Sequence, residues 1–161
     1  MLKAYKIESL VDVRHFPGSR RYPQFNKEQL AESLAKVGIE YHHLLKLGGR
    51  RRPRPDSRNT TWRNEAFRGY ADYMESQAFA DGIKELIELV GHKHLAIMCA
   101  EAVWWRCHRG LIADYLKAHG HKVLHILSLT KTEEHPFTAA ARFVNGKLSY
   151  QAATAEAELP L

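Results

Sequence analysis

The chain has 161 residues, of which 45% are hydrophobic and 26% are charged, so one packed domain is feasible and global disorder is excluded. No apolar run approaches the roughly 18 residues of a membrane span, and the N-terminal segment lacks a signal-peptide pattern, which predicts a cytoplasmic protein. Lys and Arg number 24 against 18 Asp and Glu, and the resulting net charge of +6 favours anionic partners.

The first half of the chain alternates short apolar runs with an amphipathic segment. Residues 9–13 predict a buried strand, because they form an apolar run that ends in a charged loop. Residues 27–37 carry apolar side chains at helical spacing and predict a helix that ends at Gly38. Residues 39–45 predict a second strand, and a long basic loop over residues 46–63 follows it.

The second half continues the alternation. Helical patterns cover residues 64–75 and 78–90, and residues 94–99 predict a third strand. A further helix is expected over residues 107–120, followed by a fourth strand over residues 122–127. This order predicts an α/β fold of three layers, in which a mostly parallel sheet has helices on both faces.

The C-terminal segment has a different pattern. Asn145 and Gly146 lie between short β-prone runs, which indicates a C-terminal β-hairpin. We therefore expect a single α/β domain over residues 1–150 and a flexible tail over residues 151–161.

Candidate catalytic residues follow the first and third strands. Parallel strands place their carboxyl ends at one edge of the sheet, and open α/β proteins bind ligands there. The first strand ends with Asp12 and Arg14, and the third ends with Cys99 and Glu101. These four side chains are therefore expected to converge, although they are far apart in the sequence.

Cys107, His108 and Arg109 open the next predicted helix, where unpaired N–H groups bind anions and lower the pKa of a thiol. A thiolate at Cys107, with His108 and Glu101 nearby, has the elements of a nucleophile, a base and an orienting group. The structural alternatives are buried cysteines and an ion pair between Glu101 and Arg109.

The chain has only two cysteines, Cys99 and Cys107, so a reduced pair is expected rather than a disulfide scaffold. They have no paired Cys-x-x-Cys spacing, and we expect neither a metal nor a cofactor.

Two arginine-rich loops are the candidate substrate-binding segments, because guanidinium groups suit phosphate and aromatic rings suit base stacking. The loop after the first strand contributes Ser19, Arg20, Arg21, Tyr22 and Phe25. The basic loop contributes Arg50, Arg51, Arg52 and Arg54, with Trp62 as a stacking platform. The alternative for both segments is a solvated loop without a ligand.

Four segments together resemble one known family. They are LVDVRHFPGSRRYPQFNKEQL, GIEYHHLLKLGGRRR, AFRGYADYM and IMCAEAVWWRCHRGLIADYL, and in this order they are similar to the domain of unknown function 488 family. The resemblance covers about residues 9 to 150. It implies a site made of Asp12, Arg14, Pro17, Ser19, Arg20, Pro23, Phe25, Cys99, Glu101, Cys107, His108 and Arg109.

The resemblance also implies an N-terminal strand with a Thr-Ile-Gly-His-Ser-like motif, followed by a helix leading to Asp12. It places Met1 within that helix, so this sequence is expected to lack the strand. An exposed sheet edge would then favour a homo-oligomer.

Three functions fit these features. The first is an enzyme acting on a nucleic-acid or phosphorylated nucleotide-like substrate, with arginines for phosphate and Asp, Glu, Cys and His for chemistry. The second is a rhodanese-like enzyme of thiol and sulfur transfer, because a cysteine follows a strand end. The third is a non-catalytic nucleic-acid-binding module, in which the carboxylates only orient the arginines.

Overall fold

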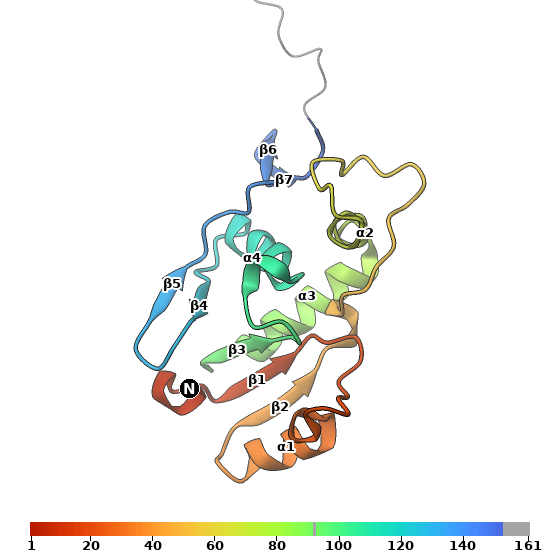
Figure 1. Ribbon diagram of the computed structural model, residues 1–161. Helices are drawn as coiled ribbons and strands as arrows, with labels where there is room; N and C mark the ends of the chain where they lie inside the picture. The colour runs from red at the N-terminus through yellow and green to blue at the C-terminus, as the bar shows by residue number, and fades with distance from the viewer. Residues whose placement is uncertain (92, 153–161) are drawn as a thin grey trace, which may run out of the picture.

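The computed structural model describes residues 1–91 and 93–152, so the predicted tail lies outside the described residues from position 153 onward. The sequence forms helices and strands close to the expected positions (Figure 1). The helices are α1 (Lys27–Ala35), α2 (Glu65–Met74), α3 (Gln77–Val90) and α4 (Arg109–Ala118). The strands are β1 (Ser9–Asp12), β2 (Glu40–His43), β3 (Leu95–Met98), β4 (Leu124–Ile126), β5 (Thr132–Glu134), β6 (Arg142–Val144) and β7 (Lys147–Ser149).

The central sheet is parallel and has the strand order β2-β1-β3. All residues of β1 are buried, because β1 lies between the other two strands. The carboxyl ends of the three strands therefore lie at one edge, and Asp12 stands in register with His43 on one side and Met98 on the other. The predicted parallel arrangement of the first three strands is confirmed.

The fourth strand does not join this sheet, and this part of the prediction is wrong. β4 pairs antiparallel with β5 in a separate two-stranded sheet. A short connection brings β5 back beside β4, and local hairpin pairing replaces the expected crossover. β5 gives little sequence signal, because all of its residues are exposed and it carries no apolar alternation. Among the described residues, β3 is consequently an edge strand.

The predicted C-terminal hairpin forms from β6 and β7. Asn145 and Gly146 adopt positive φ angles of 51° and 75°, the backbone that a tight two-residue hairpin turn requires.

Successive residues of β1 and the residue that follows it pack into two different hydrophobic clusters. Val11 and Val13 belong to the larger cluster, which includes residues of α2, α3 and α4 such as Tyr70, Phe79 and Leu111. Leu10 belongs to a smaller cluster whose other buried members are Leu30, Leu34 and Ile39. The alternation follows from the pleat of a strand, which points neighbouring side chains to opposite faces. The molecule is thus an α/β protein, and its full three-layer arrangement stays a prediction.

Candidate functional site

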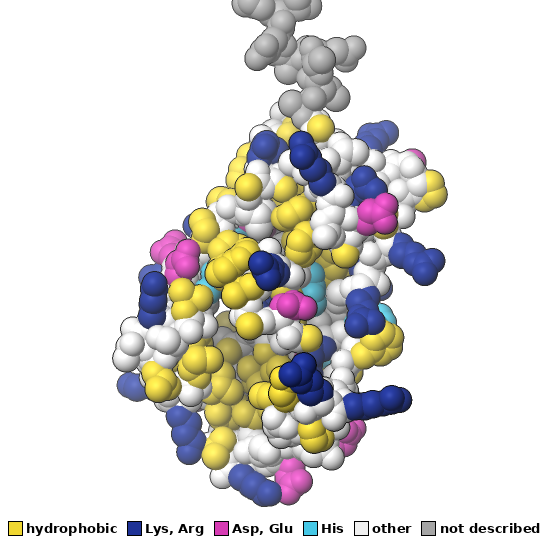
Figure 2. Space-filling view, viewed as in Figure 1, with side chains coloured by type: hydrophobic (Ala, Val, Ile, Leu, Met, Phe, Trp, Pro, Cys, Tyr) yellow, Lys and Arg dark blue, Asp and Glu magenta, His cyan; other side chains and the backbone are white. Residues whose placement is uncertain are grey.

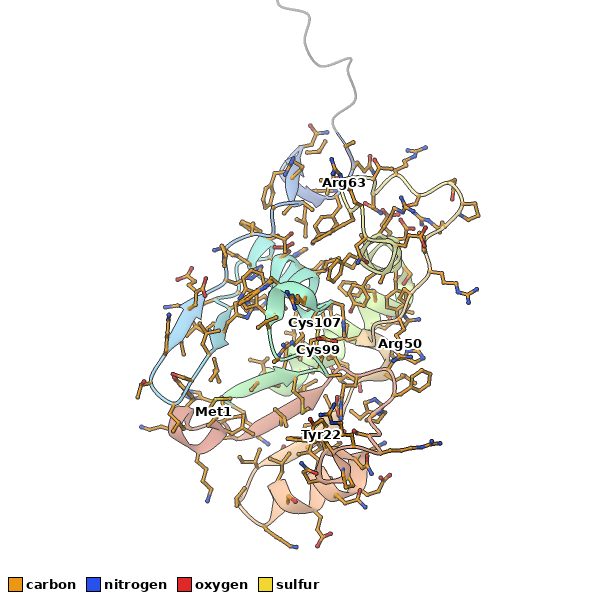
Figure 3. All side chains as sticks on the ribbon, viewed as in Figure 1. Met1, Tyr22, Arg50, Arg63, Cys99 and Cys107 are labelled. Carbon is orange, nitrogen blue, oxygen red and sulfur yellow. A yellow bond between two sulfur atoms is a disulfide. The ribbon has the colours of Figure 1, made fainter. Side chains whose placement is uncertain are left out.

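A cleft of about 440 Å³ lies at the carboxyl ends of β1 and β3, and we call it the strand-edge cleft. It gathers residues that were predicted from distant parts of the sequence, namely Arg14, Arg50, Cys99, Glu101, Cys107 and His108. Aromatic and basic side chains outside the predicted set of site residues also line it, among them His15, Phe16, Phe67, Trp105 and Arg106. Figure 3 shows Cys99 and Cys107 side by side near the end of β3, with Arg50 of the basic loop to their right.

Asp12 and Arg14 form a buried ion pair at the end of β1. A guanidinium nitrogen of Arg14 lies 2.5 Å from Asp12 Oδ2, and Arg14 Nε donates to Asp12 Oδ1 at 2.9 Å. Tyr41 on β2 adds a hydroxyl donor to Asp12 at 2.6 Å. Burial by itself would raise the pKa of Asp12, but the hydrogen bonds from Arg14 and Tyr41 outweigh it and leave that pKa lowered. Asp12 is therefore an acceptor that holds Arg14 in place.

His108 connects the start of α4 to the end of β1. Its Nε2 lies 3.1 Å from the carbonyl oxygen of Val13, and its Nδ1 lies 3.5 Å from Cys107 Sγ. Because a carbonyl oxygen only accepts, the contact with Val13 places a proton on Nε2, and the carbonyl oxygen of Leu47 is a second acceptor beside the ring. Burial lowers the pKa of His108 to about 4, so the ring is neutral at neutral pH.

Glycine at two consecutive positions of the basic loop permits this packing. A Cβ atom on Gly49 would lie 2.8 Å from Nδ1 of His108, and one on Gly48 would lie 2.9 Å from the carbonyl oxygen of Leu45. The Gly-Gly pair in the sequence thus marks a close approach of the backbone to the site.

The two cysteines are joined as a disulfide, where the sequence favoured a reduced pair. The turn before α4 brings Cys107 back to the end of β3, so the two sulfurs meet although eight positions separate them. Each sulfur also accepts a backbone N–H: Glu101 donates to Cys99 at 3.2 Å, and Arg109 donates to Cys107 at 3.4 Å. In the reduced protein, these donors favour the thiolate form of either cysteine.

Arg109 and Glu101 meet through the backbone. A guanidinium nitrogen of Arg109 donates to the carbonyl oxygen of Glu101 at 2.6 Å, and no ion pair between their side chains occurs among the described residues. Burial lowers the pKa of Arg109, and the charge of Glu101 opposes that shift. The side chain of Glu101 is exposed, and Arg109 lies outside the lining of the strand-edge cleft.

Residues 19–25 of the loop after β1 have an internal structure of their own and do not line the strand-edge cleft, whereas Arg14, His15 and Phe16 at the start of the loop do. The amide of Ser19 donates to Asn26 Oδ1 at 2.5 Å, and the amide of Tyr22 donates to Ser19 Oγ at 3.0 Å. Tyr22 and Phe25 are 47% and 46% exposed, and the guanidinium of Arg21 lies 5.3 Å from the Tyr22 ring centre. Arg20 is exposed.

The arginines at positions 50–52 of the basic loop are of two kinds: some are exposed, and one contacts neighbouring protein groups. Arg50 and Arg52 are exposed, and Arg50 has a φ of 60°, a left-handed backbone that is uncommon outside glycine. The guanidinium of Arg51 lies 3.6 Å from the ring centre of Tyr73, and its Nε donates to Gly48 O at 3.1 Å. Only part of the run is therefore available to an external anion.

The far end of the basic loop is anchored to α2 by carboxylates. Arg54 forms an ion pair with Glu75, and its amide donates to the buried Asp72 at 2.8 Å. Trp62 packs between Phe67 and Tyr150, with ring centres 4.9 and 5.9 Å away, and belongs to the margin of the core. Arg54 and Trp62 do not line the strand-edge cleft.

Fold and cleft together define a class: an α/β protein with an arginine-, aromatic- and sulfur-lined cleft at the carboxyl edge of a parallel sheet. Residues 1–116 match the family described as Domain of unknown function DUF488, and the chain belongs to this family. Comparisons with curated proteins and with solved structures gave no match.

No helix in the described ranges is long and apolar enough to cross a membrane. Within residues 1–91 and 93–152, no group of three or more His, Cys, Asp or Glu side chains is placed to hold a metal ion.

Proposed function

We propose that this protein is an enzyme that acts on a nucleic-acid or phosphorylated nucleotide-like substrate bound in the strand-edge cleft. The observation that carries this proposal is the gathering of exposed arginines, aromatic rings and a Cys–His pair around one cleft. A substrate with phosphate and a base fits such a lining, because arginine binds phosphate and aromatic faces stack on bases.

Phosphate binding is assigned to Arg50 and Arg106. Both side chains are exposed and line the cleft, whereas Arg14 is already paired with Asp12. Phe16 and Trp105 are 64% and 54% exposed, which leaves their ring faces available for stacking.

The chemical step is assigned to Cys107 in its reduced form. His108 Nδ1 takes the proton of the thiol, and the thiolate attacks a phosphorus atom of the substrate. An S–P bond forms as the P–O bond to the leaving alcohol breaks, His108 returns the proton to that alcohol, and water then hydrolyses the S–P bond. His108 is neutral at neutral pH, so Nδ1 has a lone pair for this proton, and its low pKa makes it a weak base that receives the proton only as the sulfur attacks. Because the two sulfurs form a disulfide, we expect activity only in the presence of a reductant.

A second candidate is sulfur transfer at Cys99. Its sulfur lies at the end of β3 and accepts the backbone N–H of Glu101 at 3.2 Å, which favours a thiolate. In this reaction the thiolate takes the outer sulfur of thiosulfate and releases sulfite. After reduction of the protein, a mass gain of one sulfur on Cys99 would support this candidate, and an unchanged mass would oppose it.

The first test is binding of labelled single- and double-stranded oligonucleotides across a salt titration, with an Arg50→Ala/Arg106→Ala double variant. A matched control is Lys84→Ala/Lys147→Ala, which removes the same charge from exposed positions outside the cleft. Binding that weakens steeply with salt and is lost only in the arginine variant supports the proposal. No binding at low salt, or equal loss in both variants, contradicts it.

The second test separates binding from chemistry. Reduced wild-type protein and Cys107→Ser are incubated with the oligonucleotides, and the mass of the nucleic acid is measured. We expect a product only with the wild type, while both proteins bind equally. Binding without any change of mass in the wild type would instead identify a non-catalytic nucleic-acid-binding module.

A further inference from the structure

A second cleft, of about 410 Å³, lies against β3, α3, α4 and β4, and we call it the β3–β4 cleft. Its walls are mainly apolar, with contributions from Leu86 of α3, Ile97 of β3 and Leu116 of α4. Figure 2 shows part of this region as a yellow hollow between the β4–β5 hairpin and the central sheet. Two of its lining residues, His125 and Arg109, are polar and half-buried.

A chain of three hydrogen-bonded side chains ends at His125. His125 Nε2 lies 2.8 Å from His135 Nδ1, and His135 Nε2 lies 2.9 Å from Asp114 Oδ1. His135 and Asp114 are both fully buried, each with 0% exposure. Only the outermost member of the chain therefore reaches the cleft.

The partners of Asp114 fix the direction of this chain. The amide of Thr138 donates to Asp114 Oδ1 at 2.8 Å, and the hydroxyl of Tyr150 donates to Oδ2 at 2.8 Å. Burial, followed by the nearby Asp114, raises the pKa of Tyr150, which keeps its hydroxyl protonated as a donor. Asp114 thus acts as an acceptor on both oxygens.

An accepting Asp114 requires a proton on His135 Nε2, and we infer a neutral His135 ring, whose Nδ1 is then an acceptor. His125 must then donate from Nε2, so the lone pair of His125 is on Nδ1. No described residue forms a hydrogen bond with that atom. Burial is the largest cause that lowers the pKa of His125 to about 4, so its ring is neutral at neutral pH.

Two other lining residues carry buried N–H groups that have no partner among the described residues. These are Trp104 Nε1 and Arg109 Nε. The Trp104 ring also stacks on His125, with ring centres 4.4 Å apart and planes 4° from parallel. Buried donors normally have partners, so unpaired ones beside a cleft point to a ligand. The cleft combines one acceptor, two donors and an apolar wall.

We propose that the β3–β4 cleft binds a small aromatic hydroxyl compound of the phenol class. The hydroxyl donates to Nδ1 of His125, and the aromatic body lies against the apolar wall. Asp114 and His135 are positioning residues, because they act on the ligand only through His125. This site is separate from the strand-edge cleft and does not depend on its function.

The test uses 4-nitrophenol as the probe and nitrobenzene, which lacks the hydroxyl, as the comparison compound, at about pH 5.5, where the hydroxyl is protonated and His125 is neutral. His125→Phe keeps an aromatic ring against Trp104 but removes the acceptor. His119→Phe is the matched control, since His119 stacks on Tyr115 and lies outside the cleft lining. Affinities are measured by calorimetry, and thermal unfolding verifies that both variants fold.

We expect wild type and His119→Phe to bind 4-nitrophenol about tenfold more tightly than nitrobenzene, as one hydrogen bond predicts. In His125→Phe this preference should disappear. Equal affinity of the wild type for both compounds, binding of neither, or an unchanged preference in His125→Phe would overturn the proposal.

An independent readout does not require the ligand. Nitrogen-15 NMR of the histidine rings distinguishes which nitrogen carries the proton. We expect His125 and His135 both to be protonated on Nε2 at neutral pH. A proton on Nδ1 of His125 would overturn the assignment of that atom as the acceptor.

Discussion

Nε2 of His108 lies 3.1 Å from the carbonyl oxygen of Val13, although 95 positions separate the two residues in the chain. This contact joins the first turn of α4 to the end of β1 and turns Nδ1 of His108 toward Cys107. The orientation of the proposed base is therefore determined by the backbone of the central strand.

A methyl group at position 49 should disturb that contact. In Gly49→Ala the new Cβ would lie 2.8 Å from His108 Nδ1, so the imidazole must move. We expect a loss of about 1–3 kcal/mol in the free energy of unfolding, the usual cost of overpacking. Urea denaturation measures it. Gly18→Ala is the control, because its Cβ would meet nothing closer than 4.0 Å. Equal stability of the two variants would contradict the packing argument.

Acid should destabilise the protein through His108. Its pKa is about 4 in the folded state against an ordinary value of 6.5, so between these values the unfolded chain binds the additional proton. Stability from this group is complete above pH 6.5 and is lost as the pH falls toward 4, by on the order of 3 kcal/mol. Denaturation at a series of pH values measures the effect.

The comparison variant for the pH series is His108→Gln, whose amide retains a donor for Val13 but does not titrate. We expect a shallower pH dependence in this variant than in the wild type over the same window. The exposed His119→Gln should keep the wild-type slope. If the free energy of unfolding of His108→Gln has the wild-type dependence on pH, other groups cause the loss of stability in acid.

Removal of the carboxylate at position 12 should strongly lower the free energy of unfolding. Asp12→Asn leaves the guanidinium of Arg14 buried without its counter-charge, and breaking a buried pair in this way costs about 3–5 kcal/mol. Tyr41→Phe removes only one of the hydrogen bonds to Asp12 and should cost less. The exposed pair of Glu32 with Lys36 supplies a control, and Glu32→Gln should leave the unfolding transition unchanged.

The open edge of β3 should support self-association. The carbonyl of Met98 accepts from Val13 on β1, so by alternation the amide of Ile97 points away from the sheet. We expect a concentration-dependent dimer in sedimentation experiments. Ile97→Pro removes that outward donor and should weaken the dimer, whereas Ile97→Val should not. A monomer at every concentration would exclude pairing through this edge.

The convergence of residues at the strand-edge cleft could be predicted because it follows from local rules. Val11 and Val13 lie in an apolar run, Cys99 ends another, and parallel strands bring such ends together. The ion pair of Asp12 with Arg14 was not predicted, although the two residues are only two positions apart at the end of β1.

Long-range partners were not predictable in the same way. The sequence does not reveal that Arg54 forms ion pairs with Asp72 and Glu75, or that Trp62 packs against Tyr150. The chain of Asp114, His135 and His125 also went unrecognised, because its members come from α4, from β4 and from the residue that follows β5. The only sequence signal for this chain is one histidine in β4 and one directly after β5.

The disulfide between Cys99 and Cys107 closes a segment that serves both clefts. Glu101 and Trp105 face the strand-edge cleft, while Trp104 and the following Arg109 line the β3–β4 cleft. Residues 99–107 therefore contribute to the lining of both clefts, and the disulfide joins the two ends of this segment. Reduction of this disulfide would free the segment between the two cysteines and change the lining of both clefts together. Ligand binding in either cleft would then respond to the same change in redox state.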